Sequence, residues 1–466
     1  MAKMFAVADD PNLPALPRLI DPQFMKQLFI DRLHNVDHRR WVIERVRVVE
    51  MRYRPGRRCE MIYRVRYASR SGSGWDKQFF SAIVLPPDAA RLRFDQVRHQ
   101  TYIKPEFGPA VQFFEELGLI IWGFPNDPKL PSLQQFLQPD FLQTYIQQRL
   151  DAFGLPGETE LQSLKTQVVK YVPQDRCTLK HELNWRANGQ EGGLIFFSKL
   201  FNPKFDGAGS YRVLSALSRS RVVQEGTLLF PQPILHDSQR NVIFQHALQG
   251  QHVPDDFSGC DVADLAKRCG KALAGFQQTE LPLTNVLSRR GMLLEVAESI
   301  QSVGKRQPAL LSKLLRLQKG LEDTLPGLTA LPNVTNHGAF RITQILRVDQ
   351  QLGLVDFDGV LLSDPMLDAG SFIAHLLYQA VKNELTIKES RLAIEAFCHG
   401  YREAAPWGMP SDVLRWFTIA LLISKHAKKC IRLAKKQQNI RVERLVEIAT
   451  AIWEEKLDLQ TEMPVT

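Results

Sequence analysis

The feature that most constrains this chain is an echo of sequence between two parts of its first half. Residues 53–59 (YRPGRRC) return as 171–177 (YVPQDRC), and 79–82 (FFSA) return as 196–199 (FFSK). The echo spans a whole β-hairpin, which favours two related modules over one continuous domain. The alternative is a chance similarity between two amphipathic hairpins, because such side chains are common in strands.

Both copies alternate apolar and polar residues, with proline or glycine at the turns, as is typical of strands joined by tight turns. Each copy predicts strand, turn, strand, loop and strand, then a segment with helical spacing and one more apolar strand. The first copy's strands are expected at 46–53, 60–67, 78–85 and 117–124. Those of the second copy are expected at 164–172, 178–186, 194–201 and 241–248.

After residue 255 the pattern changes to long segments with helical spacing, interrupted by a strand-rich island at 342–362. The expected helices are 262–278, 293–303, 309–325, 387–404, 411–438 and 441–455. Sheets followed by a helical part indicate an α+β chain with a cleft between two lobes.

Composition sets outer bounds on the class of protein. A chain of 466 residues with 44% hydrophobic residues buries a large core and is expected to form more than one structural unit. Its longest apolar stretches, 117–122 and 416–423, are far shorter than the roughly 20 residues that cross a bilayer, and no secretory signal is evident. The six cysteines follow no disulfide or metal-ligand spacing. We therefore expect a cytoplasmic protein without a membrane span.

The net charge of +9 is spread over the chain and indicates a basic surface, and its strongest local run is 425–436 (KHAKKCIRLAKK). Helical spacing directs Ile431, Leu433 and Ala434 toward a core and most of the lysines outward. A solvated helix face is the expected outcome, and a nucleic-acid or membrane contact is the alternative. We therefore do not expect nucleic acid as a partner.

Three segments of the island carry the chemistry. They are 337–346 (HGAFRITQIL), 354–359 (LVDFDG) and 363–368 (SDPMLD). In order and spacing they resemble the catalytic segment of the aminoglycoside phosphotransferase and choline kinase family. That family's pattern is H-G-D, four residues and N, then D-F-D, then G-D-P-x-x-D. The resemblance covers the chain from about 160 to 450.

The resemblance implies an α+β, protein-kinase-like bilobal fold with an antiparallel-sheet N-lobe and a helical C-lobe, preceded by an extra N-lobe-like module. Residues 1–155 would be that module, a duplicated N-lobe. Residues 156–252 would form the kinase-like N-lobe and hinge, and 253–466 the helical C-lobe with its catalytic-loop-like segment at 337–368.

The resemblance also implies ATP and Mg²⁺ as cofactors. Phosphoryl transfer needs side chains that position the nucleotide, hold magnesium on the phosphates and orient the acceptor hydroxyl. Asp356 would be the main magnesium ligand, and Gln344 stands where the family has a metal-binding asparagine. The alternative for Asp356 is an ordinary turn aspartate after a strand.

Three further positions correspond to the family's nucleotide-binding residues. Lys199 falls where a strand lysine grips the phosphates, although an exposed strand lysine is the alternative. Its counterpart in the first copy is expected to be Ala82, so only the second copy would form a nucleotide site. His246 and Ala247 correspond to the hinge that meets the adenine, a pattern shared by any apolar edge strand.

The pattern departs from the family at the catalytic base. Ala339 occupies the position of the aspartate that accepts the hydroxyl proton, so no catalytic residue is assigned and His337 would only support the loop. The segment 210–217 offers no glutamate to pair with Lys199, and the turn 173–176 is not rich in glycine.

Two functions fit these residues. One is an aminoglycoside-phosphotransferase-like protein that binds ATP and Mg²⁺ and transfers phosphate to a hydroxyl of a small molecule, with impaired or atypical catalysis. The other is a catalytically inactive, pseudokinase-like binding or scaffold protein with a protein partner.

Overall fold

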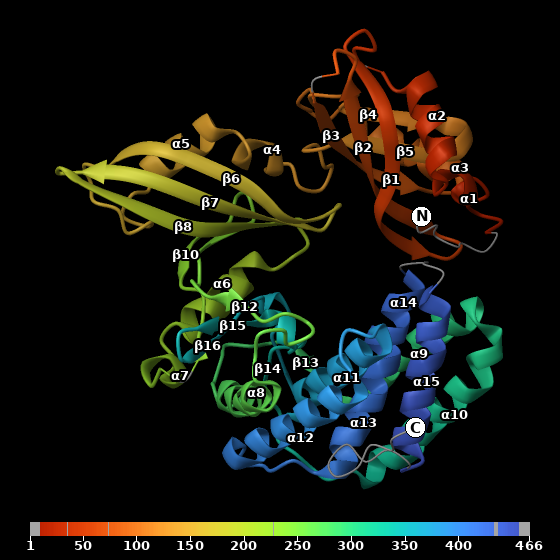
Figure 1. Ribbon diagram of the computed structural model, residues 1–466, viewed down its shortest axis with the longest axis vertical. Coiled ribbons are helices and arrows are strands. Elements are labelled where there is room, and N and C mark those ends of the chain that lie inside the picture. Colours follow the sequence, from red (N-terminus) through yellow and green to blue (C-terminus); the bar gives the residue numbers. More distant parts are fainter. Residues whose placement is uncertain (1–9, 35, 73, 227, 433–436, 456–466) are drawn as a thin grey trace. The chain divides into compact units, whose positions relative to one another are not determined.

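The computed structural model describes residues 10–34, 36–72, 74–226, 228–432 and 437–455 (Figure 1). The chain divides into two compact units. The first takes the described residues up to Ala208 together with Ile234–His246, and the second takes Gly209–Pro233, Ala247–Ile431 and the described residues from Gln437.

The first unit begins with an antiparallel sheet whose strands follow the order β1-β2-β3-β5-β4. These strands are β1 (Trp41–Arg54), β2 (Arg58–Ser69), β3 (Trp75–Val84), β4 (Val111–Phe114) and β5 (Leu119–Gly123). The accompanying helices are α1 (Leu16–Leu19), α2 (Pro22–Arg32) and α3 (Pro87–Val97).

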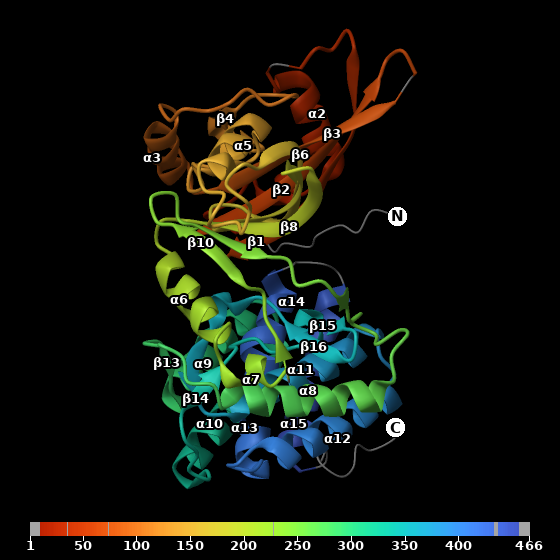
Figure 2. The same cartoon turned by 90° about the vertical axis from the view of Figure 1, so that its left-hand side faces the viewer.

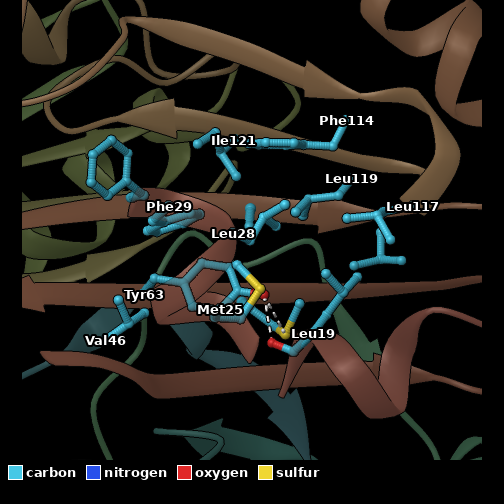
Figure 3. Close-up of a cluster of buried hydrophobic side chains, with 14 of the residues drawn as sticks. Leu19, Met25, Leu28, Phe29, Val46, Tyr63, Phe114, Leu117, Leu119 and Ile121 are labelled. Carbon is cyan, nitrogen blue, oxygen red and sulfur yellow. Dashed lines mark hydrogen bonds between the residues drawn. The ribbon is translucent and has the colours of Figure 1, made fainter. Parts of the chain in front are cut away.

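Both faces of this first sheet are covered by apolar side chains. On one face α2 packs Met25 and Phe29 against Tyr63 of β2, as Figure 3 shows. The Tyr63 hydroxyl donates to the Leu19 carbonyl at 2.8 Å, so its polar end is satisfied inside the core. On the other face Ile83 of β3 belongs to a second apolar cluster that includes Val97 of α3. The first sheet is therefore closed on both sides.

The second sheet has the order β6-β7-β8-β11-β10, which repeats the order of the first strand for strand. Its strands are β6 (Glu160–Val172), β7 (Arg176–Ala187), β8 (Gln190–Phe201), β10 (Pro233–Asp237) and β11 (Val242–His246). Its helices are α4 (Leu133–Phe136) and α5 (Pro139–Gln147), and the next helix, α6 (Gly207–Leu217), lies mostly in the second unit. The strand order confirms the predicted repeat.

The repeat extends to a buried carboxylate that braces the first hairpin turn of each copy. In the first copy Asp10 Oδ2 accepts from the Tyr53 hydroxyl and the Gly56 N–H, both at 2.7 Å. In the second, Asp127 Oδ2 accepts from the Tyr171 hydroxyl and the Gln174 N–H, again at 2.7 Å. The same bracing motif has thus been kept in both copies.

Removing this brace is expected to destabilise the two copies unequally. Burial raises the pKa of Asp127, whereas Asp10, less buried, has a lowered pKa because its hydrogen bonds outweigh its burial. Asp127→Ala leaves two buried donors unpaired, which typically costs about 1–3 kcal/mol per group. We expect Asp127→Ala to lower the free energy of unfolding by more than the matched Asp10→Ala, measured by urea denaturation. Equal losses would contradict this difference in burial.

The brace also shows how far each copy reaches. Asp10 opens the sequence DPNLPAL (10–16) and Asp127 opens DPKLPSL (127–133). Leu133 and Phe136 of α4 pack with Leu179 of β7 in one core. We therefore propose that the copies span 10–123 and 127–246, so that 127–155 belongs with the second sheet rather than with the first module.

The register of the sheets corrects one sequence alignment. Met61 of β2 pairs with Ala82, and the equivalent Leu179 of β7 pairs with Ser198. Ala82 therefore corresponds to Ser198, and Lys199 corresponds to Ile83 instead of Ala82. Because side chains alternate between the two faces of a strand, this one-residue shift places the counterpart of Lys199 on the opposite face of the first sheet. That is the face that α3 closes in the first copy.

The second unit is mostly helical. Its helices are α7 (Arg221–Gln224), α8 (Val262–Gln277), α9 (Arg289–Arg306), α10 (Leu311–Thr324), α11 (Met366–Lys382), α12 (Ile387–Ala404), α13 (Ser411–Leu421), α14 (Lys428–Arg432) and α15 (Gln437–Trp453). Helices α8 and α12 lie against each other (Figure 2). They approach closely at Gly270 and Gly400, where a Cβ would lie 2.2 Å and 2.0 Å from backbone oxygens of the opposite helix.

Two small sheets occupy the predicted island and its surroundings. One has the order β12-β15-β16-β9 and the other β13-β17-β14. Their strands are β9 (Leu228–Leu229), β12 (Gln251–His252), β13 (Val286–Leu287), β14 (Val334–Asn336), β15 (Ile345–Val348), β16 (Gln351–Leu354) and β17 (Leu361–Ser363). Antiparallel sheets in one unit and helices in the other confirm the predicted α+β class.

The single helix expected over 411–438 is interrupted. A π-helix, Leu422–Ala427, separates α13 from α14, and 433–436 lie outside the described residues. Ile431 is buried, as predicted, but Lys425 is half-buried instead of facing solvent. Within the described part of the chain, no helix has the length and apolar character needed to cross a bilayer.

Candidate functional site

The candidate site is built in the second unit around the loop that follows β14. Gly338 has a φ of +77°, and a Cβ at this position would lie 2.3 Å from the carbonyl oxygen of Gly359. Only glycine fits such a close approach with this backbone conformation. The loop lies so close to the segment that follows Asp356 that the second residue of the motif must be glycine.

His337 links this loop to the strand that precedes Asp356. Its ring is buried, 5.3 Å from the ring of Phe357, and its Nε2 lies 3.0 Å from the carbonyl oxygen of Val355. A carbonyl only accepts, so Nε2 carries the hydrogen. Burial lowers the pKa of His337, which keeps the ring neutral. His337 thus packs the loop against the strand that precedes Asp356.

Asp368 holds the same loop from α11. Its carboxylate accepts from the backbone N–H groups of His337, Gly338 at 3.4 Å and Phe340 at 3.3 Å. Burial raises the pKa of Asp368, while Lys425 and the backbone donors oppose that rise. The last aspartate of the motif is therefore a fully engaged structural group.

Lys425 is a site residue that sequence reasoning missed. Its Nζ donates to the carbonyl oxygen of Gly338 at 2.5 Å, immediately before Ala339. It comes from the π-helix, a helical irregularity that often marks functional sites. Burial lowers its pKa, and Asp368 raises it. A cation thus stands beside the position where the family has its base.

The two predicted metal ligands lie together. Gln344 Nε2 lies 3.4 Å from Asp356 Oδ2, and Gln344 Oε1 is buried without a hydrogen-bond partner. Asp356 has a φ of +74° and a ψ of 60°, a left-handed conformation that costs a residue with a side chain about 1–2 kcal/mol. Strained residues of this kind gather at functional sites.

This pair fits a magnesium ion that is shared with a nucleotide. Mg²⁺ prefers oxygen ligands and usually takes one or two protein groups together with substrate phosphates. Asp356 supplies a carboxylate, and rotation of the Gln344 amide would supply its orphaned oxygen. No group of three or more histidine, cysteine or acidic side chains suited to a metal occurs among the described residues.

Asp364 fixes the start of α11 and is not part of the metal pair. Its Oδ1 accepts from the Met366 N–H at 2.9 Å, and its Oδ2 accepts from Arg289 Nε at 2.9 Å. Burial raises its pKa, which these hydrogen bonds and Arg289 oppose. The D-P-x-x-D part of the motif therefore positions the helix and, through Asp368, the loop.

The remaining predicted residues lie elsewhere in the chain. Lys199 is half-buried on β8, between Thr178 of β7 and Ile243 of β11. It is on the face opposite Ser198, which is buried in the core. His246 ends β11 in the first unit, and Ala247 begins the next stretch of the second unit, so the chain passes from one unit to the other between these two residues. Burial lowers the pKa of His246.

Comparison with known proteins identifies the family of this segment. Residues 207–411 match the model of the phosphotransferase enzyme family. The matched range contains the loop, Gln344, Asp356 and Asp368.

Several solved structures are similar to the chain at low identity. A choline/ethanolamine kinase family protein from Mesorhizobium loti shares 14% identity over 59% of this chain and 85% of that one, with a TM-score of 0.41. A choline kinase from Cryptosporidium parvum shares 11% over 69% and 98%, with a TM-score of 0.46. Spectinomycin phosphotransferase, solved with ADP and spectinomycin, shares 13% over 68% and 98%, with a TM-score of 0.43. The family match at residues 207–411 confirms the predicted resemblance: this segment of the α+β chain is similar to the phosphotransferase enzyme family.

Proposed function

We propose that this protein binds ATP with Mg²⁺ and transfers phosphate to a hydroxyl group of a small molecule, with impaired or atypical catalysis. The observation that carries the proposal is the pairing of Gln344 with Asp356 at 3.4 Å, with the amide oxygen of Gln344 left free. The His337–Val355 hydrogen bond ties this pair to the loop. These contacts support a metal-binding role for the pair.

Each side chain has a distinct task in this proposal. Asp356 and Gln344 would hold the metal, Lys199 would bind the nucleotide phosphates, and the backbone at His246 and Ala247 would meet the adenine. Bound Mg²⁺-ATP supplies the reactive phosphoryl group and the metal's positive charge. Phosphoryl transfer depends mostly on positioning and electrostatic stabilisation, so a site without its base can retain some activity.

Loss of the Asp356 carboxylate is expected to weaken Mg²⁺-dependent ATP binding by about tenfold to a hundredfold, the effect of losing one charge-assisted contact. We choose Asp356→Asn because asparagine tolerates the left-handed backbone. Calorimetry with ATP, in the presence and absence of Mg²⁺, gives the affinities.

Asp349→Asn is the matched control. Asp349 also has a positive φ, +50°, and lies in the turn between β15 and β16, where it is exposed. It should bind Mg²⁺-ATP like the wild type. Equal losses in the two variants, or binding that ignores Mg²⁺, would refute the metal assignment.

The second candidate is a pseudokinase-like binding or scaffold protein, favoured by Ala339 and by the additional first copy. In the first copy, Ile83 and α3 cover the sheet face that corresponds to the face bearing Lys199 in the second copy. The first copy therefore offers no comparable nucleotide site. Absence of ATP binding in the wild type would favour this candidate and direct the search to protein partners.

A further inference from the structure

A cluster of basic side chains surrounds Arg341, two residues after Ala339. Its guanidinium Nε is buried without a hydrogen-bond partner. No ion pair of Arg341, Lys425 or Lys429 occurs among the described residues. Unpaired cations held close together destabilise a fold, so a bound anion would stabilise this arrangement.

The cluster is held together by an aromatic ring and the π-helix. The ring of His426 lies 4.8 Å from that of Tyr378 and 6.1 Å from that of His375. Lys429 Nζ lies 5.5 Å from the Tyr378 ring. His426 is only 9% exposed, and its Nδ1 has no hydrogen-bond partner. Two buried nitrogen atoms, on Arg341 and His426, are thus free to bind a ligand.

Three acidic groups lie near the cluster, Asp255, Asp368 and Glu295, and the charge of Glu295 raises the pKa of Lys425. Asp255 pairs with His375 at 3.3 Å and with Lys382 at 3.8 Å. Asp368 accepts backbone N–H groups of the loop. Burial lowers the pKa of Lys425 and of His426, and the nearby charge of Arg341 lowers both further. The cluster therefore keeps an excess of positive charge beside the catalytic loop.

We propose that Arg341, Lys425, His426 and Lys429 form a binding site for an oxyanion, a phosphate or carboxylate group of the acceptor molecule. Guanidinium and ammonium groups bind such oxygens by short, charge-assisted hydrogen bonds. Lys429 is exposed, so the cluster reaches solvent. The proposal rests on the proposed function and deepens it: the acceptor is a hydroxylated molecule that carries a negative charge. Polycationic acceptors are disfavoured, because like charges repel.

The test measures binding of inorganic phosphate to the full chain by calorimetry at constant ionic strength. The titration is run with and without saturating Mg²⁺ and a non-hydrolysable ATP analogue. We expect phosphate to bind in both conditions. Arg341→Gln and Lys429→Gln should each weaken binding by about tenfold, the usual effect of losing a charged hydrogen-bond donor. Lys425 is left unchanged because it also supports the Gly338 carbonyl.

Two matched variants control for general surface charge. Lys428→Gln removes the neighbouring lysine, which lies 3.8 Å from Glu298 instead. Arg347→Gln removes an arginine on β15 that donates to Gln251 at 3.0 Å. Both should bind phosphate within about twofold of the wild type, because neither side chain belongs to the cluster and salt screens more distant charges. No phosphate binding, or equal losses in the controls, overturns the proposed site.

The titration with the ATP analogue distinguishes two possible sources of a bound oxyanion, the nucleotide and the acceptor molecule. If the ATP analogue displaces phosphate, the cluster serves the terminal phosphate of the nucleotide and the acceptor assignment is wrong. Failure of this site is also distinct from failure of the proposed function. Binding of Mg²⁺-ATP without phosphate would remove the site and leave the function, whereas phosphate binding without Mg²⁺-ATP would remove the function and the acceptor role.

Discussion

Replacing Ala339 with aspartate is expected to raise the rate of ATP turnover by about 100-fold to 10,000-fold, the usual contribution of a positioned general base. The new carboxylate would follow Gly338, whose carbonyl oxygen accepts from Lys425 at 2.5 Å. A nearby cation favours the ionised form of a carboxyl group. The introduced aspartate should therefore be ionised and able to accept the proton of a hydroxyl group or of water.

The measurement is steady-state release of ADP in the presence of Mg²⁺, first with water alone and then with hydroxylated acceptors. Ala339→Asn is the control, because asparagine has nearly the same size as aspartate but accepts no proton. A large gain for aspartate alone would mean that the wild-type site is complete except for its base, as a pseudokinase-like protein requires. Equal rates in wild type and both variants would mean that this chain uses another base.

The parts of the site that the sequence could predict are close together along the chain. Gln344 and Asp356 flank the hairpin of β15 and β16, whose register pairs Ile345 with Leu354. A short hairpin brings its two ends together whatever the rest of the fold does. The family motif and local geometry were therefore enough to predict that these two side chains meet.

The residues that the sequence could not predict depend on distant packing. Lys425 reaches Gly338 across 87 positions, and its helical pattern alone gave it the same outward direction as the other lysines. Helix α11 was also missed: Met366–Gln379 is buried throughout, and a buried apolar segment is hard to assign to a helix or a strand from its pattern alone. In both cases the information lies in tertiary contacts.

The repeat is a different case, because its full extent was present in the sequence. The DPNLPAL and DPKLPSL segments begin at Asp10 and Asp127, far from the hairpins that revealed the echo. The one-residue error at Lys199 arose because the two hairpin loops differ in length. The loop between β2 and β3 runs from Ser69 to Trp75, whereas the loop between β7 and β8 runs from Ala187 to Gln190. Backbone pairing, rather than the shared FFS letters, decides which face a residue occupies.

Removing the carboxylate of Asp368 is expected to lower the free energy of unfolding of the second unit by about 2–6 kcal/mol, because two buried N–H groups would each lose their acceptor at a typical cost of about 1–3 kcal/mol. Asp368→Ala would leave the N–H groups of His337 and Phe340 unpaired and Lys425 without its compensating charge. Urea denaturation gives the free energy, and hydrogen exchange of the loop should rise. Asp264→Ala is the control, because this aspartate is exposed and lies 3.6 Å from Arg268; it should change stability by less than about 0.5 kcal/mol.

A double substitution tests the physical cause of this loss. If the penalty arises from an uncompensated charge at Lys425, then Asp368→Ala combined with Lys425→Met should cost less than the sum of the two single substitutions. The two groups interact electrostatically at the loop, where Lys425 also donates to Gly338. Strict additivity would mean that Asp368 acts only through its hydrogen bonds to the loop. In that case Lys425 is held by the Gly338 carbonyl alone, and its charge stays available to an anionic ligand whether or not Asp368 is present.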